Sequence, residues 1–400
     1  MARQPLGDMY AMTPERAREY GFVSYYNHTG SEASDKLANN ITLTSEEWAQ
    51  LLTSPVQFIL QSGGWGGAGF DVTVLPQLLL CLPWTLAFLI FRIFAQRQLS
   101  RFGLWLQVVV PKDGSKATLN NAQRRKLRKF QNQVWLTVYY IISAVFGYAV
   151  QCTKPWFGLP VSESNRIALL TPHPYKPDGG LMCYYQSGLG FYFSEMLALP
   201  VENDIRRSDF VEYFVHHIVT CALIVFSHCS YEHRFGVYVL FIHDASDIML
   251  AAGKVINYVV SAERKRAQRL KSNGGGDKQT KAKPSLLYRV IFNETTVNVC
   301  FVLFTLFFVF FRLVCLPYLA LANIVYGVKI RMFTGSYCLL IILLQGVLQG
   351  LHVYWFTLIM KIVINSLTGK RVDDIRSEDD DDGDGVEGQA VPKNSKPHRE

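Results

Sequence analysis

Blocks of apolar residues recur along most of the chain and are separated by short polar segments. Each block is roughly 18 to 25 residues long, which is the length that a helix rising about 1.5 Å per residue needs to cross about 30 Å of hydrocarbon. The sequence therefore predicts an all-α fold, a polytopic transmembrane helical bundle of about seven spans. The predicted spans cover residues 74–95, 133–151, 182–200, 210–227, 235–258, 296–319 and 337–360.

Basic residues concentrate in the segments after the first and the fifth block. Loops on the cytosolic side of a membrane carry an excess of Lys and Arg, so both segments are predicted to be cytosolic. The N-terminus is then luminal and the C-terminus cytosolic. The chain start has no apolar core, so we expect no cleavable signal peptide.

The pattern divides the chain into four parts. We predict a polar luminal tail over 1–73, a first span with a basic cytosolic loop over 74–132, a six-span domain over 133–364, and an acidic, disordered cytosolic tail over 365–400. The luminal tail carries two sequons, at Asn27 and Asn40, which are glycosylation candidates. Ser377 precedes a run of acidic residues and is a phosphorylation candidate, with a plain solvated tail as the alternative.

Composition narrows the function classes. Of the 400 residues, 50% are hydrophobic and 18% charged, which is more apolar than an ordinary soluble chain. The net charge of +8 does not indicate nucleic-acid binding, because the basic residues lie in short loops between apolar blocks. The cysteines show no zinc-ligand spacing, so we expect no metal centre. Cys152 and Cys183 flank one loop and are free to pair only if that loop faces an oxidising lumen.

Five ionisable residues interrupt the fourth and fifth apolar blocks: His216, His217, His243, Asp244 and Asp247. A charged group at the centre of a membrane helix costs about 2.5 to 3.5 kcal/mol, so such a set persists when it faces a polar cavity or pairs internally. His216 lies about 9 Å inward from one end of its span and His243 about 13 Å from the other, so the two reach similar depth. We therefore predict an internal, polar-lined cavity with these five residues as its catalytic groups.

The same five residues also fit a purely structural role, because buried polar residues hold membrane helices together through hydrogen bonds. A di-iron membrane oxygenase needs repeated histidine boxes, and 9 histidines without an HxxHH motif are too few. The His-Asp pair of a metal-dependent phosphohydrolase belongs to a soluble domain. A proton-relay transporter predicts repeated, broken helices that the sequence lacks.

The set resembles the Lag1 motif of the ceramide synthases, within the TRAM/Lag1/CLN8 family of membrane proteins. The matching positions are Arg207, Asp209, Phe210, His216, His217, Thr220, Ser227, Arg234, Gly236, His243, Asp244, Ser246, Asp247, Leu250, Lys254, Asn257 and Tyr258. Similarity outside the motif includes Lys154-Pro155-Trp156, Arg312, His352 and Trp355, and the resemblance spans about residues 74–380. His228, Tyr231 and Ala251 depart from the family pattern, and the 97–131 loop is too short for the homeobox-like insert of many animal members.

The resemblance implies transfer of a fatty acyl group from acyl-CoA to the amine of a sphingoid base (sphinganine, sphingosine or phytosphingosine) in the endoplasmic reticulum membrane. Acyl-CoA is then a co-substrate, and no bound cofactor is expected. Membrane lipids and a homo- or heterodimer are further expected partners, and chain-length preference is expected to depend on the region 317–336. The competing class is a non-enzymatic translocon-associated or lipid-sensing member of the same fold, which generally lacks the histidine pair.

Each candidate residue has an expected role in that reaction. His216 is expected to attack the thioester, and His217 to act as base or to orient the reacting groups, because adjacent helical residues diverge by about 100°. Asp244 and Asp247 are expected to orient His243 or to stabilise an imidazolium. The weaker substrate-binding candidates are Arg206, Arg207, Thr220, Lys254 and Asn257, of which the basic ones face the alternative of marking topology alone.

Overall fold

The structure is a computed structural model that describes residues 45–54, 72–111, 119–159, 162–170, 175–200, 209–272, 286–321 and 335–367. Within these ranges all regular elements are helices, which confirms the predicted all-α bundle. They are α3 (Ser45–Thr53), η2 (Val72–Val74), α5 (Leu75–Leu78), α6 (Cys81–Trp105), α7 (Asn121–Gln151), α8 (Glu163–Leu170), α9 (Gly179–Ala198), α10 (Phe210–Cys229), α11 (His233–Ser272), α12 (Leu286–Ile291), α13 (Glu294–Phe308), η5 (Val309–Cys315) and α15 (Gly335–Leu367).

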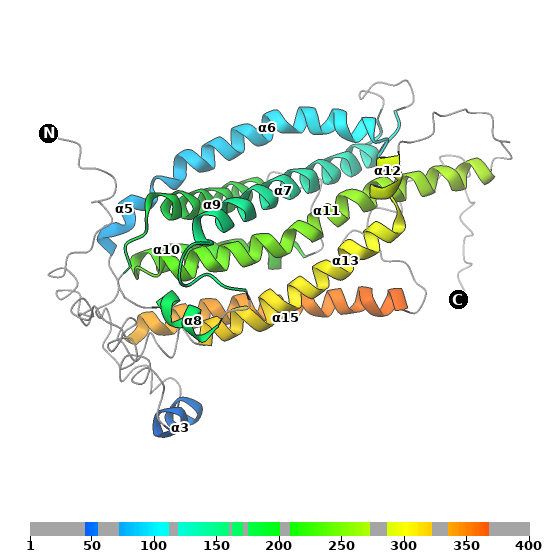
Figure 1. Ribbon diagram of the computed structural model, residues 1–400. Coiled ribbons are helices and arrows are strands. Elements are labelled where there is room, and N and C mark those ends of the chain that lie inside the picture. The colour runs from blue at the N-terminus through cyan, green and yellow to red at the C-terminus, as the bar shows by residue number, and fades with distance from the viewer. Residues whose placement is uncertain are drawn as a thin grey trace, which may run out of the picture.

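The long helices run along one common direction, and the chain passes back and forth along the bundle (Figure 1). Six helices of the described residues are long and apolar enough to cross a membrane: Val72–Trp105, Asn121–Gln151, Phe210–Cys229, His233–Gln268, Glu294–Leu321 and Leu339–Asn365. They coincide with six of the seven predicted spans. The remaining prediction, 182–200, falls on α9, which has 20 residues but is not apolar enough to count by composition.

Helix α9 is polar for a membrane helix because other helices surround it. It packs against α6, α7, α10 and α11, and twelve of its residues are buried. Gly190 makes the closest approach: a Cβ at this position would lie 2.6 Å from Trp84 Cβ and 2.9 Å from the Cys81 carbonyl oxygen of α6. Only glycine allows the two backbones to come so near.

The N-terminus of α9 is fixed by an ion pair outside the spans. Asp178 caps the helix by accepting a hydrogen bond from the Leu181 amide, and Lys154 Nζ lies 2.5 Å from Asp178 Oδ2. Partial burial raises the pKa of Asp178, but the hydrogen bonds from Lys154 and the Leu181 amide outweigh it and hold the pKa below its ordinary value. The charged form of Asp178 therefore stabilises the start of α9.

The basic segments meet at one end of the bundle. Arg266, near the end of α11, donates to the backbone carbonyl of Gln107 after α6, at 2.9 Å. Helix α7 begins at the same end, with a capping box between Asn120 and Gln123. The two segments that were predicted to be cytosolic are thus on the same side of the bundle.

At the other end, α10 and α11 are joined by a tight turn. Tyr231 adopts a left-handed backbone conformation there, with φ 59°. Glycine and asparagine adopt that conformation more readily than tyrosine does. The side chain is nonetheless buried, so packing offsets the backbone strain.

Several predictions made from the sequence lie outside the described residues, namely those at Asn27, Asn40, Arg206, Arg207 and Ser377. Cys152 and Cys183 are both free thiols, and Cys152 is exposed.

Candidate active site

The ionisable residues of α10 and α11 lie beside two adjoining pockets at the centre of the bundle. The first, which we call the histidine pocket, has a volume of about 80 Å³. The second, which we call the apolar chamber, has a volume of about 290 Å³. Tyr192 of α9 lines both, so it forms the wall between them.

The histidine pocket brings together residues from several helices. Those with polar side chains are Gln133, Tyr140, Tyr192, Tyr213, His216, His217, Asp247, Lys254, Arg312 and Trp355. The structure therefore places three of the five predicted catalytic residues, His216, His217 and Asp247, in one pocket. Lys254, a predicted substrate contact, lies two turns beyond Asp247 on α11 and lines the same pocket.

The two adjacent histidines point in different directions, as their helical spacing predicts. Their rings are 5.7 Å apart and nearly perpendicular, and His216 packs 5.3 Å from the Trp355 ring. His217 Nδ1 lies 2.8 Å from the Tyr213 carbonyl oxygen. Because a carbonyl only accepts, Nδ1 carries the proton in the neutral ring and Nε2 has the lone pair. His217 is thus held as the tautomer that a general base requires.

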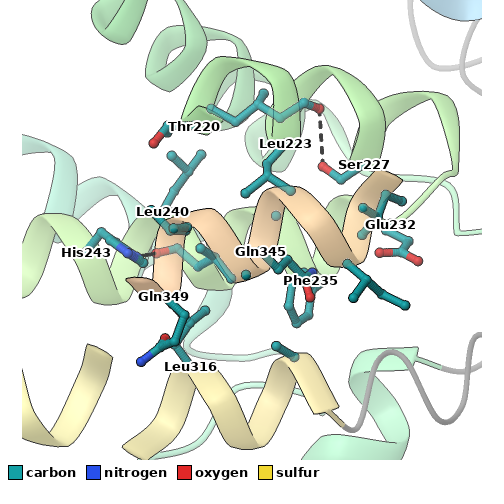
Figure 2. Close-up of a pocket in the computed structure, with 18 of the residues that line it drawn as sticks. Thr220, Leu223, Ser227, Glu232, Phe235, Leu240, His243, Leu316, Gln345 and Gln349 are labelled. Carbon is teal, nitrogen blue, oxygen red and sulfur yellow. Dashed lines mark hydrogen bonds between the residues drawn. The ribbon is translucent and has the colours of Figure 1, made fainter. Parts of the chain in front are cut away.

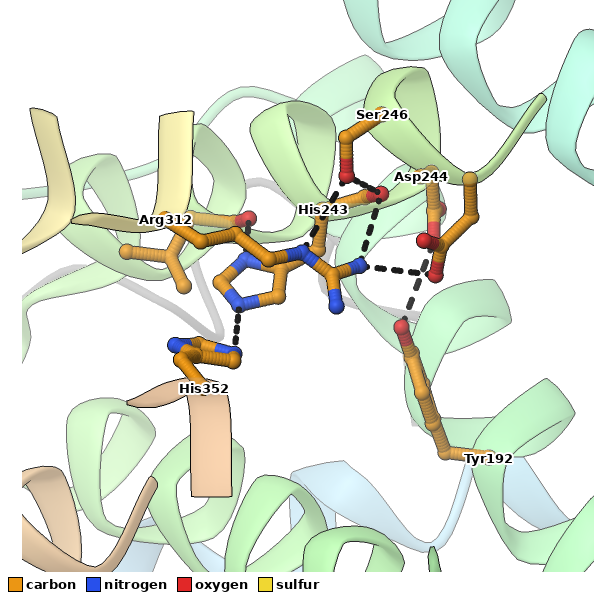
Figure 3. Close-up of polar contacts among 8 residues, drawn as sticks. Tyr192, His243, Asp244, Ser246, Arg312 and His352 are labelled. Carbon is orange, nitrogen blue, oxygen red and sulfur yellow. Dashed lines mark hydrogen bonds and ion pairs between the residues drawn. The ribbon is translucent and has the colours of Figure 1, made fainter. Parts of the chain in front are cut away.

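His243 lies on the apolar-chamber side and meets a fourth histidine, His352 of α15 (Figure 3). The Nε2 atoms of the two rings are 3.3 Å apart, and His243 Nδ1 lies 2.8 Å from the Val239 carbonyl oxygen. By the same argument Nδ1 of His243 is the protonated nitrogen, so His352 Nε2–H donates to His243 Nε2. His352 is fully buried.

Asp247 forms a buried ion pair with Arg312. Arg312 Nη2 lies 2.7 Å from Asp247 Oδ2, while its Nε and Nη2 donate to Ser246 Oγ at 3.2 Å and to the His243 carbonyl oxygen at 3.3 Å (Figure 3). Arg312 belongs to η5, a π-helical segment within the membrane helix Glu294–Leu321. The extra residue per turn of a π-helix redirects the side chains that follow, and such segments often occur at functional sites.

Asp244 lines neither pocket. Its carboxylate accepts hydrogen bonds from Ser143 Oγ of α7 at 2.5 Å and from the Tyr192 hydroxyl at 3.2 Å. The sequence predicted that Asp244 and Asp247 orient the His243 ring, and the structure shows a different arrangement. The ring nitrogens of His243 instead contact Val239 and His352, because one aspartate turns toward α7 and the other is engaged by Arg312.

The apolar chamber extends from His243 toward the α10–α11 turn (Figure 2). Apolar side chains form most of its lining, among them Leu223, Leu240 and Leu316. Thr220, Glu232, Gln345 and Gln349 are polar exceptions. Thr220, a predicted substrate contact, is therefore at the chamber, whereas Asn257 lines neither pocket and accepts a hydrogen bond from Ser261.

In the part of the chain that the structure describes, no group of three or more His, Cys, Asp or Glu side chains is arranged to hold a metal ion. The site consists of histidine side chains, one ion pair and an apolar space beside them. That combination suits acid–base or nucleophilic chemistry on a substrate with a long apolar part.

Comparison with known proteins adds an independent observation. Residues 129–361 match the TLC domain, named for TRAM, LAG1 and CLN8 proteins, over more than half of the chain. The chain belongs to the TLC-domain family. Its relatives include mouse ceramide synthase 3, 29% identical over 64% of this chain and 56% of the relative, and mouse ceramide synthase 4, 31% identical over 63% and 54%. The Arabidopsis thaliana ceramide synthase 1 LOH3 is 29% identical over 64% of this chain and 75% of its own length.

The chain thus spans little more than half the length of the two mouse relatives. Both pockets are built from side chains that lie mainly within the TLC domain: α7, α9, α10, α11, α13, η5 and α15 fall largely inside the matched region. The TLC domain therefore supplies nearly all the side chains that line the histidine pocket and the apolar chamber.

Sequence reasoning missed several residues of this TLC-domain site. It identifies Arg312 and His352 only as matches to the family, and it assigns no role to Ser143 or Tyr192. Arg312 and His352 were detectable, because each is an ionisable residue inside an apolar block. Ser143 and Tyr192 carry no such signal, since hydroxyl side chains are common in membrane helices.

Proposed function

We propose that this protein is a ceramide synthase, which transfers a fatty acyl group from acyl-CoA to the amine of a sphingoid base. The observation that carries the proposal is the position of His216 and His217, in a pocket that adjoins an apolar chamber across Tyr192. The reaction needs a nucleophile or base beside a space for a long hydrocarbon chain. The names of the relatives agree with that chemistry.

In the first half of the reaction, His216 attacks the thioester carbonyl. A bond forms between the imidazole nitrogen and the acyl carbon, the carbon–sulfur bond breaks, and CoA leaves as the thiolate. Lys254 is the cation of the histidine pocket nearest the basic end of the bundle, and we assign it to the anionic part of CoA. The acyl chain extends into the apolar chamber.

In the second half, the sphingoid amine attacks the acyl carbon. The carbon–nitrogen bond of the amide forms, the bond to His216 breaks, and the amine proton passes to His217 Nε2. That nitrogen has its lone pair available because Nδ1 donates to the Tyr213 carbonyl. The charge that develops on the imidazole lies near the Asp247–Arg312 pair, which also lines the pocket.

The site also suits the predicted setting, the endoplasmic reticulum membrane with the N-terminus in the lumen. Acyl-CoA is anionic and cytosolic, and the basic segments gather at one end of the bundle. The sphingoid base enters from the bilayer with its apolar tail. The dimer, the glycosylation of Asn27 and Asn40 and the phosphorylation of Ser377 stay predictions.

A non-enzymatic lipid-sensing role is the second candidate, because the apolar chamber alone is suited to hold a lipid. The histidine pocket argues against it, since lipid sensing needs neither a histidine pair nor a fixed His217 tautomer.

The test is N-acylation of sphinganine by acyl-CoAs of graded chain length, in microsomes that contain this protein. We expect activity in the parent and a loss of about 100-fold or more in His216→Ala and in His217→Ala. Ile218→Ala is the matched control, because Ile218 follows the pair on α10 and is 46% exposed on the outer face.

A parent that acylates sphinganine with none of the acyl-CoAs, at matched protein level, supports the lipid-sensing role instead. Full activity in both histidine variants would place the chemistry elsewhere in the bundle.

A further inference from the structure

A third and larger cavity lies away from the histidine pocket. Its volume is about 750 Å³, and it is formed by α6, α7 and the C-terminal end of α9. Four arginines line it, Arg92 and Arg97 from α6 and Arg124 and Arg128 from α7. Gln96, Gln131 and Asn132 add amide groups. The proposed acyl transfer uses none of these residues.

Helix α7 separates this cavity from the histidine pocket. Asn132 and Trp135 face the arginine-lined cavity, whereas Gln133, Leu136 and Tyr140 face the histidine pocket. No residue lines both. The cavity is therefore a separate site within the described residues.

The inner wall of the cavity is held together by an ion pair between Arg92 and Glu195. Arg92 is buried, with Nη1 2.5 Å from Glu195 Oε1 and Nη2 donating to Asn132 Oδ1 at 3.0 Å. Trp135 Nε1 donates to the same carboxylate oxygen at 3.0 Å. The guanidinium group of Arg92 is thus balanced by Glu195 and held in one position.

Three arginines line the outer part of the cavity. Arg97, Arg124 and Arg128 are all exposed. They lie near the end of α6 and the start of α7, at the bundle end where the basic segments meet. Three arginines that line one hollow favour a ligand with a phosphate group, because guanidinium groups match phosphate oxygens in charge and geometry.

The opposite part of the cavity is apolar and open to the bilayer. Leu89, Ile93 and Leu197 line it, and Ile93 and Leu197 are 62% and 55% exposed on the outer surface of the bundle. A free phosphate or nucleotide does not need such a wall, but the acyl chain of a lipid does.

We propose that this cavity binds an anionic phospholipid, with its phosphate among Arg97, Arg124 and Arg128 and an acyl chain along Ile93 and Leu197. The lipid fills the space between α6 and α7 and joins the first span to the domain that holds the histidine pocket. Recognition depends on the phosphate and the tail together.

The test uses the purified full chain in a non-ionic detergent, with dioctanoyl phosphatidic acid as the probe and native mass spectrometry or calorimetry as the readout. The cavity variant is Arg97→Gln/Arg128→Gln. The matched control is Arg101→Gln/Arg125→Gln, which removes the same number of charges from the same two helices but from residues that do not line the cavity. Arg124 stays, because its Nε donates to the Leu119 carbonyl oxygen.

We expect saturable binding of phosphatidic acid that weakens by about tenfold or more in the cavity variant and by less than about threefold in the control. Dioctanoyl phosphatidylcholine, which has the same tails without net charge, is expected to bind more weakly than phosphatidic acid to the parent. Excess CoA and inorganic phosphate are expected not to displace the probe.

Equal weakening in both variants would overturn the proposal, because binding would then reflect general surface charge. Displacement by CoA would assign the cavity to the acyl donor, and displacement by inorganic phosphate at similar concentration would show that the tail contributes nothing. None of these outcomes depends on acyl transfer, so failure of the lipid site and failure of the enzymatic proposal are distinguishable.

Discussion

Several charged side chains inside this bundle are paired with an opposite charge or hydrogen-bonded. Asp247 is paired with Arg312 and Glu195 with Arg92, while Asp244 accepts hydrogen bonds from two hydroxyl groups. Removing one member of a buried pair leaves an uncompensated charge and typically costs about 3 to 5 kcal/mol. Variants of these residues are therefore expected to lower the stability of the fold as well as the activity. The histidines are better probes of the reaction.

His352 is the most informative of these histidines. The change His352→Phe keeps a ring in the buried site but removes the donor to His243 Nε2, which lies 3.3 Å away. An unsatisfied buried polar group costs about 1 to 3 kcal/mol, so we expect kcat for acyl transfer to fall by about tenfold to a hundredfold. The KM for acyl-CoA is expected to change little.

His352→Gln is the companion variant, because its amide N–H is able to donate in place of the imidazole. Partial recovery of kcat in His352→Gln, at equal thermal stability of both variants, identifies His352 as a positioning residue. Parent-level kcat in His352→Phe would exclude that role.

The candidate catalytic residues differ in how far the sequence alone could predict them. Helical spacing predicted that the rings of His216 and His217 diverge, as they do. Of the five residues predicted to share one cavity, His216, His217 and Asp247 line the histidine pocket, His243 lines the apolar chamber, and Asp244 lines neither. It did not predict the partners of Asp244 and Asp247, because these come from α7, α9 and η5, and the spacing within one helix carries no information about which neighbour packs on which face. The π-helical segment around Arg312 has no sequence signal in the apolar run VFFRLVC.

Among the helices, α9 depends most on close packing. Gly190→Ala would gain about 1 kcal/mol of helix propensity, but its Cβ would meet backbone atoms of α6 at 2.9 Å and 3.0 Å, which cannot move aside as a side chain can. Overpacking costs about 1 to 3 kcal/mol, so we expect net destabilisation of up to about 2 kcal/mol. Unfolding monitored by circular dichroism in mixed micelles measures it.

Gly350→Ala on α15 is the control, because a Cβ there has no atom within 4 Å. It is expected to leave stability unchanged or to raise it slightly. A Gly190→Ala protein as stable as the parent would mean that α6 and α9 separate easily.

The start of α9 has a pH dependence that can be derived from Asp178. The native pKa of Asp178 is below its ordinary value, because the hydrogen bonds from Lys154 and the Leu181 amide outweigh burial. The charged form therefore stabilises the fold above the unfolded pKa, and this contribution is lost as the pH falls through the native pKa. Asp178→Asn keeps a good helix cap without the charge.

We expect the Tm of Asp178→Asn to lie below that of the parent at neutral pH and to converge with it in acid. Equal Tm differences at both pH values would show that the charge of Asp178 does not stabilise the fold.

At the scale of the whole molecule, the lengths of the apolar blocks predicted six membrane helices. Many of the predicted helix ends lie within a few residues of the observed ones. The first and last helices extend further than their apolar cores, to Trp105 and Leu367, because polar residues continue a helix into the interface. The seventh prediction coincides with α9, whose buried position explains why its composition is weaker. The positions of the cavities could not be predicted from the sequence, because they depend on how all the helices pack together.

The orientation of the bundle follows from the basic segments and is open to a direct test. If the N-terminus is luminal, Asn27 and Asn40 receive glycans, and endoglycosidase H increases the mobility of the protein from microsomes. Asn27→Gln/Asn40→Gln is expected to migrate like the treated parent. Ile375→Asn, which completes a sequon with Ser377 in the acidic tail, is expected to remain unmodified if that tail is cytosolic, as we predict.

The opposite pattern, with the tail sequon glycosylated and the N-terminal ones bare, would invert the bundle. Lys254 and the basic end would then face the lumen, where the proposed entry of acyl-CoA from the cytosol is impossible. Because acyl-CoA cannot cross the bilayer unaided, the glycosylation pattern decides whether the histidine pocket is reached from the basic end of the bundle or from the α10–α11 turn.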